Sequence, residues 1–159
     1  MICGHACGRM TMISMVVFVG CMITASVMDL HRQRVIRLVW LLAVMASASI
    51  AGAYAVENGI ERRAMVELFL FVLLQQIWFC RFYGRADCHA FSVCALFMSG
   101  FGWNMYWWIL HMAVTFLLLA LVQLAKKNVN KKGNLKKPVP LIPYITISLF
   151  LLYPGRVYM

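Results

Sequence analysis

Two aspartates carry the chemistry that this sequence most clearly offers. Asp29 and Asp87 are the only aspartates in the 159-residue chain, and each lies at an end of an apolar run. An ionisable side chain at membrane depth costs about 2.5 to 3.5 kcal/mol on insertion scales, so by default it marks a candidate functional site. Two carboxyl groups that share a proton can hydrolyse a peptide, because the ionised one takes a proton from water while the protonated one polarises the scissile carbonyl. Such a pair requires that both aspartates lie on one face of the membrane.

Each aspartate also has a simpler interpretation as a helix-end charge beside an arginine. Arg32 and Arg34 follow Asp29, and Arg85 precedes Asp87. Exposed ion pairs contribute only about 0 to 1 kcal/mol. For either aspartate alone we favour this structural interpretation. If both aspartates lie on the same face of the membrane, we favour the catalytic pair.

Composition indicates an integral membrane protein. Hydrophobic residues make up 64% of the chain, and the mean hydropathy is +0.81, both well outside the soluble range. The net charge of +10 comes from bases that lie in short blocks between apolar runs. Bases placed in this way set topology and contact anionic lipids. We therefore expect a lipid membrane as partner and no nucleic acid, since no soluble domain could present a basic aromatic surface.

The six cysteines include no C-x-x-C pair, so neither a zinc ribbon nor a disulfide framework is indicated. Cys3-x-His5-x-Cys7 has a spacing that could ligate a metal, but we interpret it as a frayed, apolar-flanked terminus. No metal site and no cofactor are expected.

Apolar runs predict an all-α fold, with one polytopic membrane domain over residues 1–159. The expected transmembrane helices are residues 11–30, 35–54, 64–83, 86–102, 105–125 and 139–153. A cleaved signal peptide is the alternative for the first, but this run exceeds the usual apolar region of about 7 to 15 residues and lacks a clear A-x-A site. A basic loop over 126–138, rich in lysine, is expected to join the last two spans.

The distribution of basic residues predicts the orientation of the six spans. Strict alternation places five arginines and six lysines on one side: Arg32, Arg34, Arg37, Arg81, Arg85, Lys126, Lys127, Lys131, Lys132, Lys136 and Lys137. The other side has Arg9, Arg62, Arg63 and Arg156. The positive-inside rule makes the larger set cytoplasmic and both termini extracytoplasmic. Asp29 and Asp87 then both face the cytoplasm. If one span were miscounted, the two aspartates would lie on opposite faces of the membrane and could not form a pair.

Other polar and aromatic residues receive structural interpretations. Glu67, near the start of the third span, is interpreted as an interfacial or helix N-terminal charge rather than a catalytic acid. Gln75 and Gln76 are expected to bond neighbouring helices. An aromatic cluster predicts a belt at the membrane–water interface rather than a ligand cage. It consists of Trp103, Tyr106, Trp107 and Trp108.

Taken together, these residues resemble type IV prepilin peptidases, the membrane aspartyl proteases that include preflagellin peptidases. Gly84-Arg85-Ala86-Asp87 is similar to their Gly-x-Gly-Asp motif at the start of the fourth helix. Asp29, with the basic stretch at 31–34, is similar to the aspartate after their first helix. The resemblance covers nearly the whole chain, including the six spans, the basic loop and Pro143-Tyr144 at the start of the last helix.

The resemblance implies a GxGD-type aspartyl protease bundle in the plasma membrane of a prokaryote. Asp29 and Asp87 would be catalytic, and Gly84 and Ala86 would position the second aspartate. The family cleaves basic leader peptides from prepilin-like precursors at the cytoplasmic membrane face, so such a precursor is the expected partner. Larger members carry a four-cysteine zinc domain and methylate the product; this chain has no counterpart, and we expect proteolysis alone.

Three positions depart from the family pattern. Ala86 replaces the second motif glycine, Val35-Ile36-Arg37 replaces the usual Ile-Pro-Asn, and His89 stands where a basic residue is common. The alternative function is therefore a noncatalytic relative that acts as an assembly or scaffold subunit of a pilus or secretion apparatus. A third class, a small ion or solute carrier, would need midplane charges and a repeat between halves, and neither is clear.

Overall fold

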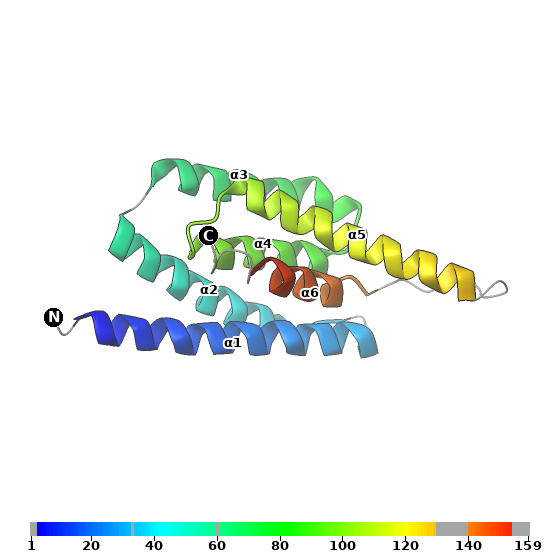
Figure 1. Cartoon of the computed structure of the whole chain (residues 1–159), viewed down its shortest axis with the longest axis horizontal. Helices are drawn as coiled ribbons and strands as arrows, with labels where there is room; N and C mark the ends of the chain where they lie inside the picture. The colour runs from blue at the N-terminus through cyan, green and yellow to red at the C-terminus, as the bar shows by residue number, and fades with distance from the viewer. Residues whose placement is uncertain (1–2, 33, 60, 130–139, 154–159) are drawn as a thin grey trace.

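The computed structural model of the chain (Figure 1) describes residues 3–32, 34–59, 61–129 and 140–153, with side chains for 11–31, 34–59, 61–125 and 140–153. Within these residues all regular structure is helical, which confirms the predicted class. The elements in chain order are α1 (Cys3–Arg32), α2 (Arg37–Asn58), α3 (Arg62–Ile77), the 3-10 turn η1 (Phe79–Arg81), α4 (Arg85–Ser99), α5 (Met105–Val129) and α6 (Ile142–Leu152).

Four of the described helical segments are long and apolar enough to cross a membrane. They are Thr11–His31, Arg37–Asn58, Arg62–Arg81 and Met105–Ala125. Large apolar side chains such as Val16, Leu41 and Phe69 are exposed on them, as expected for helices in lipid. These four helices indicate a membrane protein.

Helices α4 and α6 are too short to cross a bilayer by helix length alone. They contain 15 and 11 residues, or about 22 and 16 Å at 1.5 Å per residue, against a hydrocarbon core of about 30 Å. All six predicted helices are present, but length supports four crossings where the sequence predicts six.

The predicted third span, 64–83, corresponds to the apolar helical segment Arg62–Arg81. The α-helix stops at Ile77, and the chain continues through η1. The Tyr83 hydroxyl donates a hydrogen bond of 2.7 Å to Oε1 of Gln75, back within α3. This bond ties the connection to the helix it has just left and directs the chain into α4.

The basic loop predicted over 126–138 is wrong at its start. Helix α5 continues to Val129, because lysine and alanine are good helix formers and nothing breaks the helix before Asn130. Residues 130–138 lie outside the described part of the chain. The last helix begins at Ile142, with Pro143 at its second position, and Pro140 precedes it.

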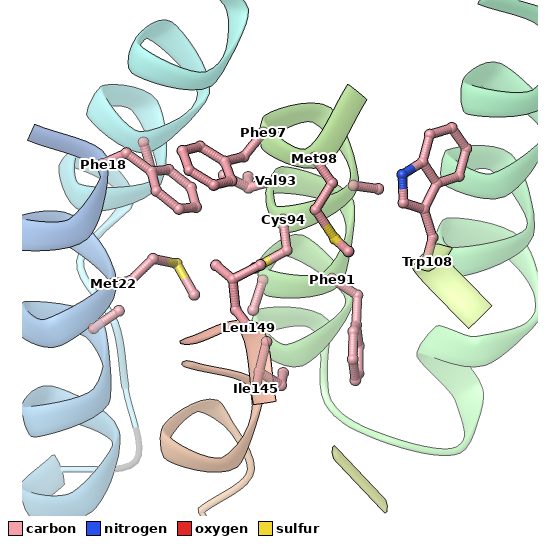
Figure 2. Close-up of a cluster of buried hydrophobic side chains, with 14 of the residues drawn as sticks. Phe18, Met22, Phe91, Val93, Cys94, Phe97, Met98, Trp108, Ile145 and Leu149 are labelled. Carbon is pink, nitrogen blue, oxygen red and sulfur yellow. The ribbon is translucent and has the colours of Figure 1, made fainter. Parts of the chain in front are cut away.

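Helix α4 is the centre of the fold. It contacts α2, α3, α5 and α6, and Figure 1 shows it between the α3 and α5 pair and the α1 and α2 pair. Figure 2 shows Phe91, Cys94 and Phe97 of α4 among side chains from α1, α5 and α6. Phe18 of α1 stacks on Phe97 with ring centroids 4.0 Å apart. This packing holds α4 in one position along its own axis, and it therefore determines where the N-terminus of α4 lies.

Two glycines allow the bundle to form. Gly59 follows the end of α2 and has a φ of 83°, a region that glycine enters without steric cost. At Gly100, a Cβ atom would lie 2.7 Å from Cγ2 of Ile50 and 2.9 Å from the backbone nitrogen of Ala51. Gly100 therefore permits the close approach of α2 and α4.

The aromatic belt prediction is wrong for two of its four members. Trp103 and Trp108 are 4% and 1% exposed, whereas Tyr106 is 70% exposed. Trp108 packs against Phe71 of α3 with ring centroids 5.4 Å apart. The helix places residue 108 on the face that meets α3, so this tryptophan fills the core.

Candidate active site

A cavity of about 1020 Å³ lies where α1 ends and α4 and α6 begin. Asp29 from α1 and Asp87 from α4 both line it. In Figure 1 these three helix ends lie toward the same end of the bundle, on the right. The two aspartates that the sequence analysis paired are therefore at the same end of the bundle and face one space.

The rest of the cavity wall is mostly apolar and aromatic. It is formed by Phe79, Phe82, Tyr83, Gly84, Arg85, Ala86, Phe116, Leu119, Gln123, Pro140 and Leu141. An apolar wall strengthens electrostatic interactions between the groups it surrounds. A cavity of about 1020 Å³ has room for water beside the two carboxyl groups.

Asp29 is held from the start of α6. Its side chain is buried, with 8% of the residue exposed. The backbone N–H of Ile142, 113 residues away, donates to Oδ2 of Asp29 at 3.2 Å. One turn deeper, the hydroxyls of Ser26 and Thr146 are 2.9 Å apart and join the same two helices. Asp29 thus links α1 to α6, a contact that the sequence analysis did not predict.

Asp87 is placed by the first turn of α4. Gly84 is the N-cap, and its carbonyl accepts hydrogen bonds from the N–H groups of Asp87 at 3.1 Å and Cys88 at 3.2 Å. The half-buried carboxylate interacts with the backbone of Gly84 and with the Asp29 carboxylate across the cavity. An acid in a first helical turn also benefits from the helix dipole.

The backbone conformation at positions 84 and 86 does not require glycine. Gly84 has a φ of −55°, and a Cβ built there would lie 3.6 Å from Oδ2 of Asp87, an ordinary contact. Ala86 is partly buried and lines the cavity. The departure at Ala86 therefore adds a methyl group to the cavity wall without straining α4.

The other two departures lie away from the cavity lining. Arg37 is exposed at the start of α2. His89 faces α3 and α2: its Nδ1 is 3.3 Å from Nε2 of Gln76, and its ring centroid is 6.4 Å from that of Trp40. Neither side chain shares a wall with the aspartates.

Ion pairs with Arg34 or Arg85 do not account for the aspartates. Of the side chains that the structure describes, only Arg63 and Glu67 form an ion pair, with 2.9 Å between Nε and Oε1. Arg34 and Arg85 are described and pair with neither aspartate, while the side chain of Arg32 lies outside the described part.

Glu67 occupies a comparable structural position at the opposite end of the bundle. Its Oε2 accepts a hydrogen bond of 3.2 Å from the N–H of Met105, the first residue of α5. This agrees with its interpretation as a helix N-terminal charge, although the helix is α5 and not its own.

The glutamine prediction is confirmed. Gln75 donates to Sδ of Met112 at 2.9 Å and accepts from Tyr83, while Gln76 contacts His89 and Ser92 on α4. Tyr83 is a cavity residue that the sequence analysis missed. Nothing in its local sequence sets it apart from other tyrosines, since its partner lies eight residues earlier on α3.

No cluster of three or more His, Cys, Asp or Glu side chains that could hold a metal ion occurs in the described ranges. The side chains of Cys3, His5 and Cys7 fall outside those ranges, although their backbone continues α1 and is not frayed. The aspartate cavity itself offers two carboxyl groups and no third ligand of these types.

No family model, curated protein or solved structure matches the chain.

Proposed function

We propose that the chain is a membrane-embedded aspartic endopeptidase similar to type IV prepilin peptidases. The observation that carries the proposal is that Asp29 and Asp87, the only two aspartates, line one cavity from different helices. A carboxyl pair of this kind supports peptide hydrolysis by sharing one proton, without a cofactor.

The substrate in this proposal is a prepilin-like precursor with a basic leader peptide. It would be cleaved at the cytoplasmic face of a prokaryotic plasma membrane, with six crossings and both termini outside. The split of basic residues supports this orientation, and the apolar walls of the cavity suit an apolar segment next to the scissile bond. For α4 and α6, crossing would require their flanking residues, or packing against the longer helices, to complete the span.

One observation favours the noncatalytic alternative, a scaffold subunit of a pilus or secretion apparatus. Asp29 already has a structural partner in the Ile142 N–H, and a carboxylate that caps a helix needs no catalytic role to be retained. Cleavage assays with isosteric amide variants separate the two functions.

The test is cleavage of a cognate precursor, followed by its mobility shift on a gel. Asp29→Asn and Asp87→Asn should each abolish processing, because an amide cannot exchange the proton that the mechanism moves. The asparagine carbonyl can still accept the Ile142 N–H, so the fold should survive. Residues that act as a unit are strongly non-additive, so the double variant should be hardly worse than either single one.

Glu67→Gln is the matched control. Glu67 also accepts a helix N-terminal N–H at 3.2 Å, as Asp29 does, but lies at the far end of the bundle. It should cleave at nearly the wild-type rate. Near-normal cleavage by either aspartate variant, or loss of cleavage in Glu67→Gln with normal membrane expression, would refute the proposed function.

A further inference from the structure

The start of α6 faces Asp29 with backbone groups that lack helical partners. The first N–H groups of a helix have no intrahelical acceptor, and the helix dipole makes this end positive. The Ile142 N–H donates to Asp29 at 3.2 Å, and the backbone of Leu141 interacts with the same carboxylate. Among the described side chains no cation pairs with Asp29, so its described close contacts with positive groups are these backbone N–H groups.

Asp87 has fewer such partners. Its carboxylate interacts with the backbone of one residue, Gly84, from its own first turn. Donors to an ionised carboxylate favour its ionised form. Two facing carboxylates repel when both are charged, so a single negative charge should settle on the one with more donors. The other titratable side chains that line the cavity are Tyr83 and Arg85, and Cys88 lies next to Asp87 in the same turn.

We propose that the peptide N–H of Ile142 is a positioning group that keeps Asp29 as the ionised member of the pair, so that Asp29 is the general base and Asp87 carries the proton. This inference rests on the proposed function for its role in hydrolysis, but the ionisation order can be measured without a substrate.

The assignment gives a balanced reaction. Asp29 takes a proton from water as the water oxygen bonds to the carbonyl carbon, while Asp87 gives its proton to the carbonyl oxygen. When the resulting diol collapses, the C–N bond breaks and the proton on Asp29 goes to the amine nitrogen. One hydroxyl proton of the diol returns to Asp87, which restores both aspartates and leaves a carboxylic acid.

The first experiment reads each aspartate separately in the full chain. A suppressor tRNA charged with 13C-labelled aspartate places the label at position 29 or 87 during cell-free synthesis into lipid nanodiscs, and infrared spectra are recorded over a pH series. The carboxylate band of the Asp29 label should appear at lower pH than that of the Asp87 label. The reverse order, or an indistinguishable order, overturns the proposal.

The second experiment removes the donor with Ile142→Pro. Proline is well tolerated at the first helical position, where the N–H that it removes has no acceptor within the helix. We expect the Asp29 carboxylate band to appear at higher pH than in the wild type, and kcat for precursor cleavage to fall about tenfold or more with little change in KM, as expected for misplacement of a reacting group. Ile142→Val keeps the N–H while trimming the same buried side chain, and should match the wild type in both readouts. An unshifted band in folded Ile142→Pro overturns the proposal.

Folding of the proline variant is checked by elution of the nanodiscs and by thermal unfolding. Leu141 has φ −97° and ψ −31°, a region disfavoured before proline, so the wild-type infrared series decides the question if this variant does not fold. A wild-type chain that cleaves no precursor refutes the proposed function, while the infrared order still decides the ionisation inference separately.

Discussion

Gly100 shows how a single residue sets the spacing of two helices. A Cβ there would meet the backbone nitrogen of Ala51 at 2.9 Å as well as the Ile50 side chain. Backbone atoms cannot rotate away, so α2 and α4 would have to separate. The same shift would reach the core around Phe97, which depends on the present position of α4.

We therefore expect Gly100→Ala to lower the free energy of unfolding by about 1 to 3 kcal/mol, the range for overpacked cores. Gly52→Ala is the control, because a Cβ at Gly52 meets nothing within 4 Å. It should be neutral or stabilise the helix by about 0.5 to 1 kcal/mol. Unfolding by SDS in mixed micelles measures both. Equal effects of the two substitutions would contradict the close approach of α2 and α4.

The two aspartates could be found from the sequence, but their partners could not. Rarity, position at the ends of apolar runs and the charge asymmetry were enough to select Asp29 and Asp87. The Ile142 N–H and the Tyr83 side chain belong to the same site, yet a backbone N–H has no sequence signature. Contacts over 113 residues depend on how α1 and α6 pack, which hydrophobic periodicity does not specify.

At the scale of elements, the apolar runs located all six helices but not all of their ends. Lipid-facing and core-facing sides are both apolar, so hydropathy cannot tell a helix that crosses from one such as α4, eight of whose 15 residues are buried. The connection after α3 folds back on that helix through the Tyr83–Gln75 bond, a contact between side chains that hydropathy does not specify. Burial in the aromatic cluster also depends on tertiary packing, so the sequence could not show that Trp108 is buried while Tyr106 is exposed.

Buried hydroxyl pairs join α6 to the bundle. Oγ1 of Thr115 on α5 and Oγ of Ser148 on α6 are 2.6 Å apart and buried. Nearby, Nε2 of the buried His111 lies 3.0 Å from the Ile145 carbonyl. Ile145 and Ser148 lie on the buried side of α6, so these polar contacts act together with apolar packing to hold the helix that carries Ile142.

We predict a favourable coupling energy of about 0.6 kcal/mol, and at most about 1.7, between Thr115 and Ser148, the range for hydrogen bonds between membrane helices. The cycle consists of Thr115→Val, Ser148→Ala and the double variant, with unfolding free energies measured in SDS titrations. Ser49→Ala removes an exposed hydroxyl that bonds only within α2 and should have little effect. Strict additivity of the two core substitutions would argue against the Thr115–Ser148 bond.

At the scale of the whole molecule, the two ends of the bundle differ in both their charge and their candidate chemistry. The aspartate cavity lies at the end where α1, α3 and α5 finish, and the Glu67–Arg63 pair lies at the other. Most basic residues flank the aspartate end in sequence: those around the α1–α2 link, those around Gly84 and those after α5. A membrane protein with this asymmetry should insert with the aspartate end toward the cytoplasm.

The orientation can be tested by cysteine labelling in a variant whose six native cysteines are replaced by serine or alanine. Asn130→Cys, in the basic segment after α5, should react with a membrane-impermeant maleimide only after spheroplasts are permeabilised. Asn104→Cys lies in the exposed connection between α4 and α5, at the other end of the bundle, and should be labelled in intact spheroplasts. The physical reason is that moving the larger set of bases across the membrane is disfavoured, whereas the smaller set imposes little barrier.

Labelling of Asn130→Cys in intact spheroplasts would show that the topology is the reverse of the predicted one, with the aspartates on the extracytoplasmic side. Labelling of both positions from one side would show that the connection after α4 does not lie across the membrane from the end of α5.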